Sequence, residues 1–470
     1  MKTASLVFVS CVMAFASCTH KQDDIPVDYT QDTGPRVELN LRTAETGFVP
    51  ERFIGRGFNL VTHRREDRDG ISRYPVLDMQ KIKNGTPWNP WKEDVDLSDA
   101  DAPQILVDNE EPGIFKGSDV ETVTNSYNID SIGISLDGKF KDVTFNVKYK
   151  KNDRYASKSH IYRSFKYLTR YRVSLDAGEK DCQHYIRRNF FKDLSDLSAA
   201  DLVKKYGTHL VTAYDLGPFS DCVIFARSSV FSEQEGLDIA FSVFGATLDV
   251  HTANKSKTNS KDITIHYTQG GSDYYPKNLK NPSGVFKFGE MPGIEIDKFY
   301  AQVRPGDNPF ISLDKSTKLI AIPDLIPDMC LKVKYACGIL HAANPGKEIQ
   351  YVICNPESFE PIKLFGEFVY FTATAFDTSD VFVYYGNEIN RFSLSAIGQG
   401  SSDSSLWMLH IYPNGKATFT HKTGGYLTRD FKLLRADEPT AQCFFAINPI
   451  VPREGFDDHF SWNNIMIKNK

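Results

Sequence analysis

The sequence predicts an α+β protein that ends in an all-β region, and three patterns carry this prediction. Apolar residues alternate over 160–175 and 262–271, as they do in half-buried strands. A short capped helix is predicted between these strands, and two other segments fit a helix or a strand equally well. From about residue 338 onward, turn glycines and aromatic residues separate short strands without helical periodicity.

The first 17 residues read as a signal peptide, with Lys2 before an apolar stretch that is too short to span a membrane comfortably. Small residues directly before Cys18 resemble the lipobox of bacterial lipoproteins, in which this cysteine becomes the lipidated first residue. The acidic residues that follow resemble the surface-export flag of Bacteroidetes-type lipoproteins. We therefore expect a lipid anchor at Cys18, a tether over 18–46, and a location on the outer membrane surface or in the medium. An ordinary signal peptide with an incidental cysteine is the alternative.

Composition excludes several function classes. A net charge of -5 gives no global basic field, so nucleic acid is not an expected partner. Six cysteines follow Cys18 in a compartment that permits disulfides, and their pairing stays open. They show no metal-ligand spacing, so we expect no metal and no cofactor. Because no nucleophile-base motif, paired carboxylates or phosphate loop stands out, we expect no catalytic residues and no enzyme.

The folded part is expected to begin with a strand over 53–63 that two glycines interrupt. The two segments of ambiguous pattern are Asp130–His160 and Ser232–Ser260. In the second segment, Ile239 and Val243 share one face of a helix, yet the same stretch also alternates as a strand would. The apolar residues that alternate in the two segments are Val143, Phe145 and Val147, and Leu237, Ile239, Phe241 and Val243.

The sequence Tyr206-Gly207-Thr208-His209 marks a predicted junction between a helix and a strand. Ser198 is the expected N-cap of the helix, and Gly207 fits the left-handed C′ position that ends it. Residues 208–217 then alternate as a strand. Because His209 has no partners at metal-ligand spacing, we interpret it as a packed structural residue.

This junction resembles the signature of the membrane attack complex/perforin (MACPF) family, in which Gly217 is the first of two closing glycines. The chain departs from the signature at Leu210, where the family has an aromatic residue, and at Pro218, where it has the second glycine. Gly270 and Gly271 resemble the glycine pair at the sheet bend of the family. The two ambiguous segments fall where the family has its membrane-inserting helical clusters.

The resemblance implies a MACPF domain over 47–336, built on a bent, twisted four-stranded antiparallel sheet that two helical clusters flank. In the family these clusters unfurl into β-hairpins, which join those of other subunits in a ring-shaped barrel. A segment that is first a soluble helix and later a membrane strand needs a sequence without a strong preference. The ambiguous pattern of the two segments agrees with this requirement.

Residues 337–470 are expected to form a C-terminal β domain that selects a receptor. A weak repeat aligns Phe392 with Tyr426 and Trp407 with Phe444 or Phe445, and it resembles the β-trefoil. A β-sandwich is the alternative. Trp407 and Phe445 lie at positions typical of a core, so no glycan-binding residue is assigned.

Two functions from different classes remain. The first is a pore-forming protein that binds membrane lipid or a surface glycan or protein receptor, self-assembles on the membrane and damages it, as toxins used against competing strains do. The second is a non-lytic adhesion or glycan-binding protein on the same fold.

Overall fold

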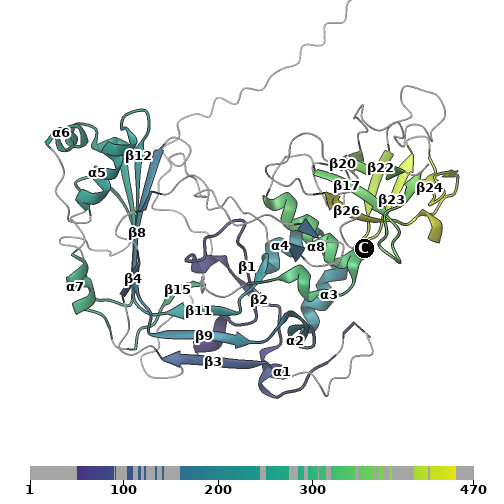
Figure 1. Ribbon diagram of the computed structural model, residues 1–470, viewed down its shortest axis with the longest axis horizontal. Helices are drawn as coiled ribbons and strands as arrows, with labels where there is room; N and C mark the ends of the chain where they lie inside the picture. The colour runs from purple at the N-terminus through teal and green to yellow at the C-terminus, as the bar shows by residue number, and fades with distance from the viewer. Residues whose placement is uncertain are drawn as a thin grey trace, which may run out of the picture. The chain divides into compact units, whose positions relative to one another are not determined.

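The protein is described from a computed structural model (Figure 1). The residues that the structure describes are 50–88, 90–91, 103–109, 115–117, 121–122, 133–134, 140–141, 159–243, 250–274, 284–290, 295–304, 306–313, 319–343, 349–364, 367–368, 370–373, 381–383, 407–421 and 424–450.

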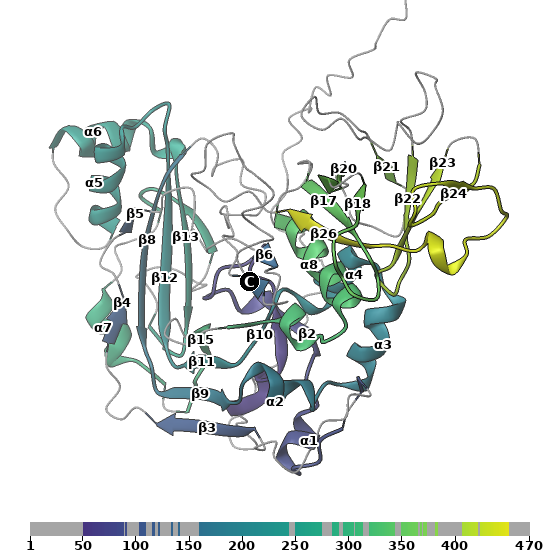
Figure 2. The ribbon, with the colours of Figure 1, turned by 45° about the vertical axis from the view of Figure 1, so that its right-hand side comes forward.

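Two antiparallel sheets have matching strand orders. The first is β14-β13-β12-β8-β4, with β5 also paired to β8, and the second is β15-β11-β9-β3 (Figure 2). Their strands are β3 (Gln104–Asn109), β4 (Phe115–Gly117), β5 (Glu121–Thr122), β8 (Ser159–Leu168), β9 (Tyr171–Asp176), β11 (Ala213–Leu216), β12 (Phe219–Arg227), β13 (Ile263–Gly270), β14 (Gly284–Lys287) and β15 (Phe310–Leu313).

The two sheets are the halves of one bent sheet, because β8 runs on into β9 and β11 into β12 with only two residues between them. Backbone hydrogen bonds continue across the bend: the Leu168 amide donates to the Pro218 carbonyl and the Arg170 amide to the Leu216 carbonyl, each at 2.9 Å. The predicted α+β class with a bent antiparallel sheet is therefore confirmed.

Helices α5 (Glu233–Val243) and α6 (Val250–Thr258) lie in the connection between β12 and β13, followed by the 3₁₀ turn η4 (Ser260–Asp262). The corresponding connection between β4 and β8 falls mostly outside the described residues. Within it the structure describes β5 and a two-stranded pair, β6 (Gly133–Ile134) and β7 (Phe140–Lys141).

A small sheet of order β16-β10-β1-β2 lies at the Tyr206–His209 junction. It contains β1 (Arg56–Phe58), β2 (Ile71–Pro75), β10 (His209–Leu210) and β16 (Ile320–Ala321). The expected strand over 53–63 is thus only three residues long, because the 3₁₀ turn η1 (Pro50–Phe53) precedes it and Gly55, at φ +74°, turns the chain. The expected strand over 208–217 is divided between β10 and β11, which belong to different sheets.

Helix α4 (Ala199–Tyr206) packs against β1 and β2 of this small sheet, and α8 (Met329–Ala343) packs against α4 and α3 (Arg188–Asp196). The predicted cap of α4 is present, since the Asp201 amide donates to the Ser198 hydroxyl at 3.1 Å. Gly338 of α8 lies against α4 so closely that a Cβ there would come within 2.5 Å of the Ala199 carbonyl oxygen. The shorter helices are α1 (Met79–Lys83), α2 (Glu179–Gln183), α7 (Ile296–Ala301), and the 3₁₀ turns η2 (Arg68–Gly70) and η5 (Ile322–Leu325).

Beyond α8 the regular elements of the described chain are short strands and one 3₁₀ turn. Three antiparallel groups are present: β20-β17-β26, β18-β19 and β21-β22-β23-β24-β25. Their bounds are β17 (Ile349–Cys354), β18 (Lys363–Leu364), β19 (Glu367–Phe368), β20 (Tyr370–Ala373), β21 (Val381–Val383), β22 (Trp407–Ile411), β23 (Ala417–His421), β24 (Tyr426–Leu427), β25 (Leu433–Leu434) and β26 (Ala446–Ile450), with the 3₁₀ turn η7 at Ala441–Cys443.

The boundary expected between residues 336 and 337 falls inside α8, so the chain crosses it within one continuous helix. Phe445 is fully buried, whereas Phe392 lies outside the described residues. The trefoil-like repeat and the division into domains stay predictions.

Candidate functional site

Helix α5 packs its apolar side against one face of the long half of the sheet. Ile239 and Ala240 are fully buried, and Val243 is 5% exposed. Alternate residues of β12, among them Ile224 and Ala226, point to this side because successive side chains of a strand face opposite ways. The buried cluster consists of Tyr162, Cys222, Ile224, Ala226, Phe231, Ile239, Ala240, Val243, Ile263, Ile265, Tyr267, Tyr274 and Phe299. Figures 1 and 2 show α5 and α6 beside the far ends of β8 and β12.

Polar contacts fix both ends of this helical insertion. The Tyr162 hydroxyl of β8 donates to the Glu233 carbonyl at 2.5 Å, in the first turn of α5. Burial and the nearby carboxylates raise the pKa of Tyr162, so its hydroxyl keeps its proton. Lys255 of α6 contacts Glu235 of α5 at 2.8 Å. The Lys255 contact, helped by the Ser232 donors, lowers the pKa of Glu235 to about 2. The two helices are thus joined to each other and to β8.

The four insertion candidates on the second ambiguous segment all lie on α5. Ile239 and Val243 are buried against the sheet and Leu237 is partly buried beside them. Phe241 is 37% exposed on the opposite side of the helix. The segment is helical here, which is one of the two structures that its sequence allows. Val143, Phe145 and Val147 lie outside the described residues.

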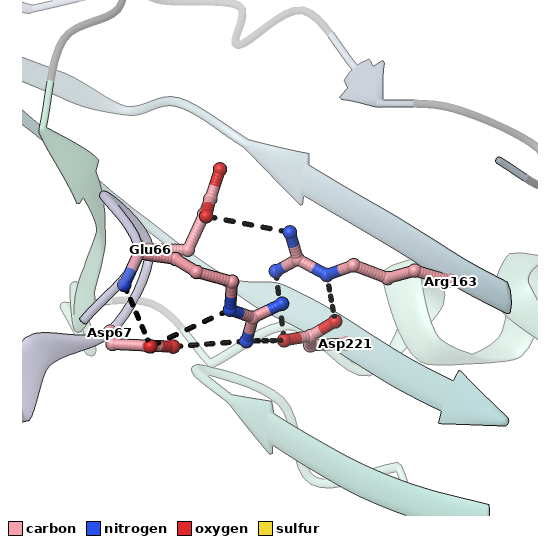
Figure 3. A network of polar contacts seen from close by, with 5 residues as sticks. Glu66, Asp67, Arg163 and Asp221 are labelled. Atoms are coloured by element: carbon pink, nitrogen blue, oxygen red, sulfur yellow. Dashed lines mark hydrogen bonds and ion pairs between the residues drawn. The ribbon is translucent and has the colours of Figure 1, made fainter. Parts of the chain in front are cut away.

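The other face of the sheet carries a buried ionic network (Figure 3). Arg163 of β8 is 1% exposed, and its guanidinium donates to both carboxylate oxygens of Asp221 on β12, at 2.7 and 2.9 Å. Glu66 lies 3.4 Å from the same guanidinium, and Arg64 lies 3.6 Å from Asp221 and 2.9 Å from Asp67. The network therefore joins the loop after β1 to two central strands.

Sequence reasoning missed this network. The charged residues RREDRD at 64–69 show no pattern that predicts a buried contact. A signal was present, because Arg163 stands among apolar residues on the inward face of its strand, where an unpaired charge is costly. Two further arginines, one at the bend and one on β9, also have partners: Arg170 donates to the Arg304 carbonyl at 2.9 Å, and Arg172 pairs with Asp215 at 3.0 Å.

The Tyr206–His209 junction is crossed closely by β1. A Cβ on Gly207 would lie 2.6 Å from the carbonyl carbon of Phe58, and one on Gly57 would lie 1.6 Å from the Tyr206 carbonyl oxygen. Gly207 has φ +84° and ψ -150°, so the expected left-handed helical conformation is wrong. Its positive φ is present, but its ψ belongs to a region that essentially only glycine occupies.

The other three residues of the junction have structural partners. The Tyr206 hydroxyl donates to the Asp193 carboxylate at 2.5 Å. Thr208 is fully buried, and its hydroxyl donates to the Phe58 carbonyl and accepts from the Leu60 amide, each at 3.0 Å. His209 Nδ1 contacts the Thr208 hydroxyl at 2.9 Å. Burial and the positive charge of Arg65 lower the pKa of His209 to about 3, so the ring is neutral at physiological pH.

The three remaining glycines of the candidate set lie at the bend of the sheet. Gly217 has φ +152°, and a Cβ there would lie 2.0 Å from the Leu168 carbonyl oxygen. Gly270 ends β13, and Gly271, at φ +76°, lies against Pro218. Pro218 has no backbone N–H to donate, but its carbonyl accepts a hydrogen bond from the Leu168 amide.

All six cysteines beyond Cys18 that the structure describes are buried with free thiols: Cys182, Cys222, Cys330, Cys337, Cys354 and Cys443. Burial raises the pKa of Cys182 to about 12 and that of Cys330 to about 11. Within the described ranges, no cluster of three or more histidine, cysteine or acidic side chains could hold a metal ion. No helix of those ranges combines the length and the apolar character that crossing a membrane requires.

No protein-family model matches the chain, and no curated protein matches it in sequence. Solved structures do match. A protein with a MAC/Perforin domain from Bacteroides thetaiotaomicron is 13% identical with a TM-score of 0.43, over 73% of this chain and 71% of that one. GNIP1Aa from Chromobacterium piscinae is 11% identical with a TM-score of 0.40, over 84% and 69%.

A third match is astrotactin-2, described as a conserved vertebrate-specific and perforin-like membrane protein. It is 14% identical with a TM-score of 0.25, over 61% of this chain and 97% of that one. The chain is thus similar in structure to proteins described as having a MAC/perforin domain or as perforin-like.

Proposed function

We propose that this chain is a MACPF-type protein that oligomerises on a target membrane and inserts a β-hairpin formed from the α5–α6 connection. One observation carries the proposal. The helical insertion connects β12 and β13, which are hydrogen-bonded neighbours over eight residue pairs, from Phe219 opposite Gly270 to Ala226 opposite Ile263. If α5 and α6 unfold, the two strands can lengthen without a change of register.

The register fixes which residues would then face each other. Continuing from Ala226 opposite Ile263, one residue at a time, places Val243 opposite Ala246. The turn of the hairpin would fall at Phe244-Gly245, and a glycine suits such a turn. Residues 244–249 lie outside the described ranges, so their part in the proposal rests on their sequence.

Next to its turn, over 237–243 and 246–252, the extended hairpin would have one mainly apolar face, which Glu235 and Glu233 continue toward β12. On it, Phe241 faces Leu248, Ile239 faces Val250 and Leu237 faces Thr252, beside Val243 and Ala246. The opposite face would carry mainly polar residues, namely Asp238, Ser242, Thr247, Asp249 and His251, with Ala240 between them. Alternation of this kind is typical of a membrane barrel, whose strands expose apolar residues to lipid and polar residues to the lumen.

To cross a membrane, such a hairpin needs arms of sufficient length and partners for its backbone hydrogen-bonding groups. A membrane strand requires about 9 to 11 residues. The arms 228–243, after β12, and 246–262, before β13, are longer than this, and their alternating apolar part covers 237–243 and 246–252. A lone hairpin would leave backbone groups unpaired in lipid, so it is stable only in a closed barrel. Self-association on the membrane therefore forms part of the proposal, and so does a second hairpin from the segment Asp130–His160, which rests on its sequence.

A charge at position 241 tests the proposal sharply. Phe241 is already 37% exposed in the helical state, so Phe241→Asp should fold normally, yet it would place a carboxylate on the lipid face. Ser242→Asp introduces the same charge one residue later, on the lumen face. We expect Phe241→Asp to abolish most dye release from vesicles of bacterial phospholipids, whereas Ser242→Asp should keep it. Equal release by the two variants would contradict the hairpin.

The alternative is a non-lytic adhesion or glycan-binding protein. It becomes the better proposal if the wild-type chain binds vesicles or cells but releases dye from none of the membranes tried. Use as an antibacterial toxin is the narrower form of the lytic proposal. We assign receptor selection to residues 337–470 and no catalytic role to any residue.

Surface anchoring through Cys18 is proposed from the lipobox alone. Cys18→Ser should shift the protein from the detergent phase to the aqueous phase in detergent partitioning, because it removes the acylated residue. Equal partitioning of the variant and the wild type would rule the anchor out.

A further inference from the structure

Two arginine guanidinium groups lie near one phenylalanine ring at the start of the fold, and a third arginine is bonded to the backbone beside it. The guanidinium carbon of Arg52 lies 4.4 Å from the centroid of the Phe53 ring, and that of Arg68 lies 5.8 Å from it. Arg56 is tied to the same place, because its Nε donates to the Arg52 carbonyl at 3.0 Å. The three side chains come from η1, β1 and η2, and each is partly buried.

Among the residues that the structure describes, no carboxylate forms an ion pair with any of the three. Within the described ranges, Arg56 donates to three carbonyl oxygens, those of Arg52, Ser72 and Arg73. The nearby Glu51 is engaged elsewhere, at 2.7 Å from Lys83. By contrast, the partly or fully buried Arg64, Arg163 and Arg172 each have a carboxylate within 3.0 Å.

The cluster is electrostatically unfavourable as it stands. Burial is the main cause that lowers the pKa of Arg52, Arg56 and Arg68, and the positive charges of Arg68 and Arg56 lower that of Arg52 further. Like charges in a partly desolvated place repel more strongly than in water. The Tyr214 hydroxyl, which accepts from the Phe53 amide at 3.3 Å, adds a polar group at the same place.

We propose that Arg52, Arg56 and Arg68 form a binding site for a phosphate group, either free or carried by a lipid headgroup. A guanidinium offers several N–H donors in a planar fork that matches phosphate oxygens at two points. A bound phosphate would also supply an anion in direct contact, which the described part of the chain does not provide; Asp69 raises the pKa of Arg68 without forming an ion pair with it. The site lies outside the α5–α6 connection, so this inference does not depend on pore formation.

The test uses the full mature chain, with inorganic phosphate as the first probe and isothermal calorimetry and thermal melting as readouts. The variant Arg52→Gln/Arg68→Gln removes two charges of the cluster. The matched control Lys192→Gln/Arg435→Gln removes two charges from exposed side chains elsewhere. We expect phosphate to raise the melting temperature of the wild type and the control, and to bind the cluster variant at least tenfold more weakly.

The second probe separates the two sources of phosphate. Vesicles of phosphatidylcholine with phosphatidic acid should bind the wild type better than the cluster variant if the ligand is a headgroup. Free phosphate is the ligand if inorganic phosphate, but not the vesicles, binds the wild type better than the cluster variant. The proposal is overturned if neither probe does. If the double variant fails to fold, Arg68→Lys replaces it in the test. This variant keeps the positive charge but loses the planar guanidinium, and it should still weaken phosphate binding several-fold.

Discussion

Arg163 on β8 and Asp221 on β12 contact each other at two points on the sheet face opposite α5. The pair runs diagonally, because Asp221 lies directly opposite Phe165 and Arg163 opposite Val223 in the register. Glu66 and Arg64 bring the loop after β1 to the same two side chains. One guanidinium that is 1% exposed thus holds two strands and a loop.

Removing one partner of this pair should be costly. Asp221→Ala removes the carboxylate that the buried Arg163 contacts at two points, while the longer contact to Glu66 and the packing on the Phe165 ring stay. Breaking a buried ion pair in this way typically costs about 3 to 5 kcal/mol. We expect a clearly lower midpoint of urea unfolding. Lys298→Ala, which breaks an exposed ion pair with Glu295, is the control and should change the midpoint little. Equal midpoints for the two variants would show that the network contributes nothing to stability.

The features that the sequence predicts correctly depend on residues that are close together in the chain. The cap of α4 depends on Ser198 and Asp201, three residues apart, and the long strands depend on alternation within ten residues, so both are readable without a fold. The Arg163–Asp221 pair joins residues 58 positions apart, and the contact between Gly207 and Phe58 spans still more. Such contacts exist only once the strand register is set. The helical state of α5 was undetermined because packing against the sheet, and not local preference, stabilises it.

Gly207 allows a matched comparison with Gly289. Both have a similar positive φ, +84° and +89°, but a Cβ meets the Phe58 backbone at position 207 and nothing within 4 Å at position 289. Gly289→Ala should cost only the backbone strain, about 1 to 3 kcal/mol. Gly207→Ala should cost more, because the ψ of Gly207 lies in a region that essentially only glycine occupies and because β1 must also move away. Similar melting temperatures for the two variants would show that a Cβ at position 207 fits without displacing β1.

His209 should make the fold sensitive to acid. Its pKa is about 3 in the folded chain and about 6.5 in an unfolded one, because burial and Arg65 disfavour the charged ring. Between these values the unfolded state binds the proton and the folded state does not, so the free energy of unfolding falls as the pH falls from about 6.5 to about 3. Melting curves of the wild type and His209→Gln across this range test the effect. We expect a shallower decline for the variant; parallel curves would assign the acid sensitivity to other groups.

The Tyr162 hydroxyl should slow the release of α5 from the sheet. Tyr162→Phe keeps the buried ring and removes only the bond to the Glu233 carbonyl, a loss of about 1 kcal/mol or a few-fold in an opening equilibrium. We expect faster hydrogen exchange of the α5 amides and, if the hairpin proposal holds, a shorter lag before dye release. Tyr426→Phe, which removes a hydroxyl bond on β24, is the control and should alter neither readout. Exchange is measured on the soluble chain, so it tests the contact even if no membrane is lysed. Unchanged exchange in Tyr162→Phe would mean that apolar packing alone, through Ile239 and Val243, holds the helix in place.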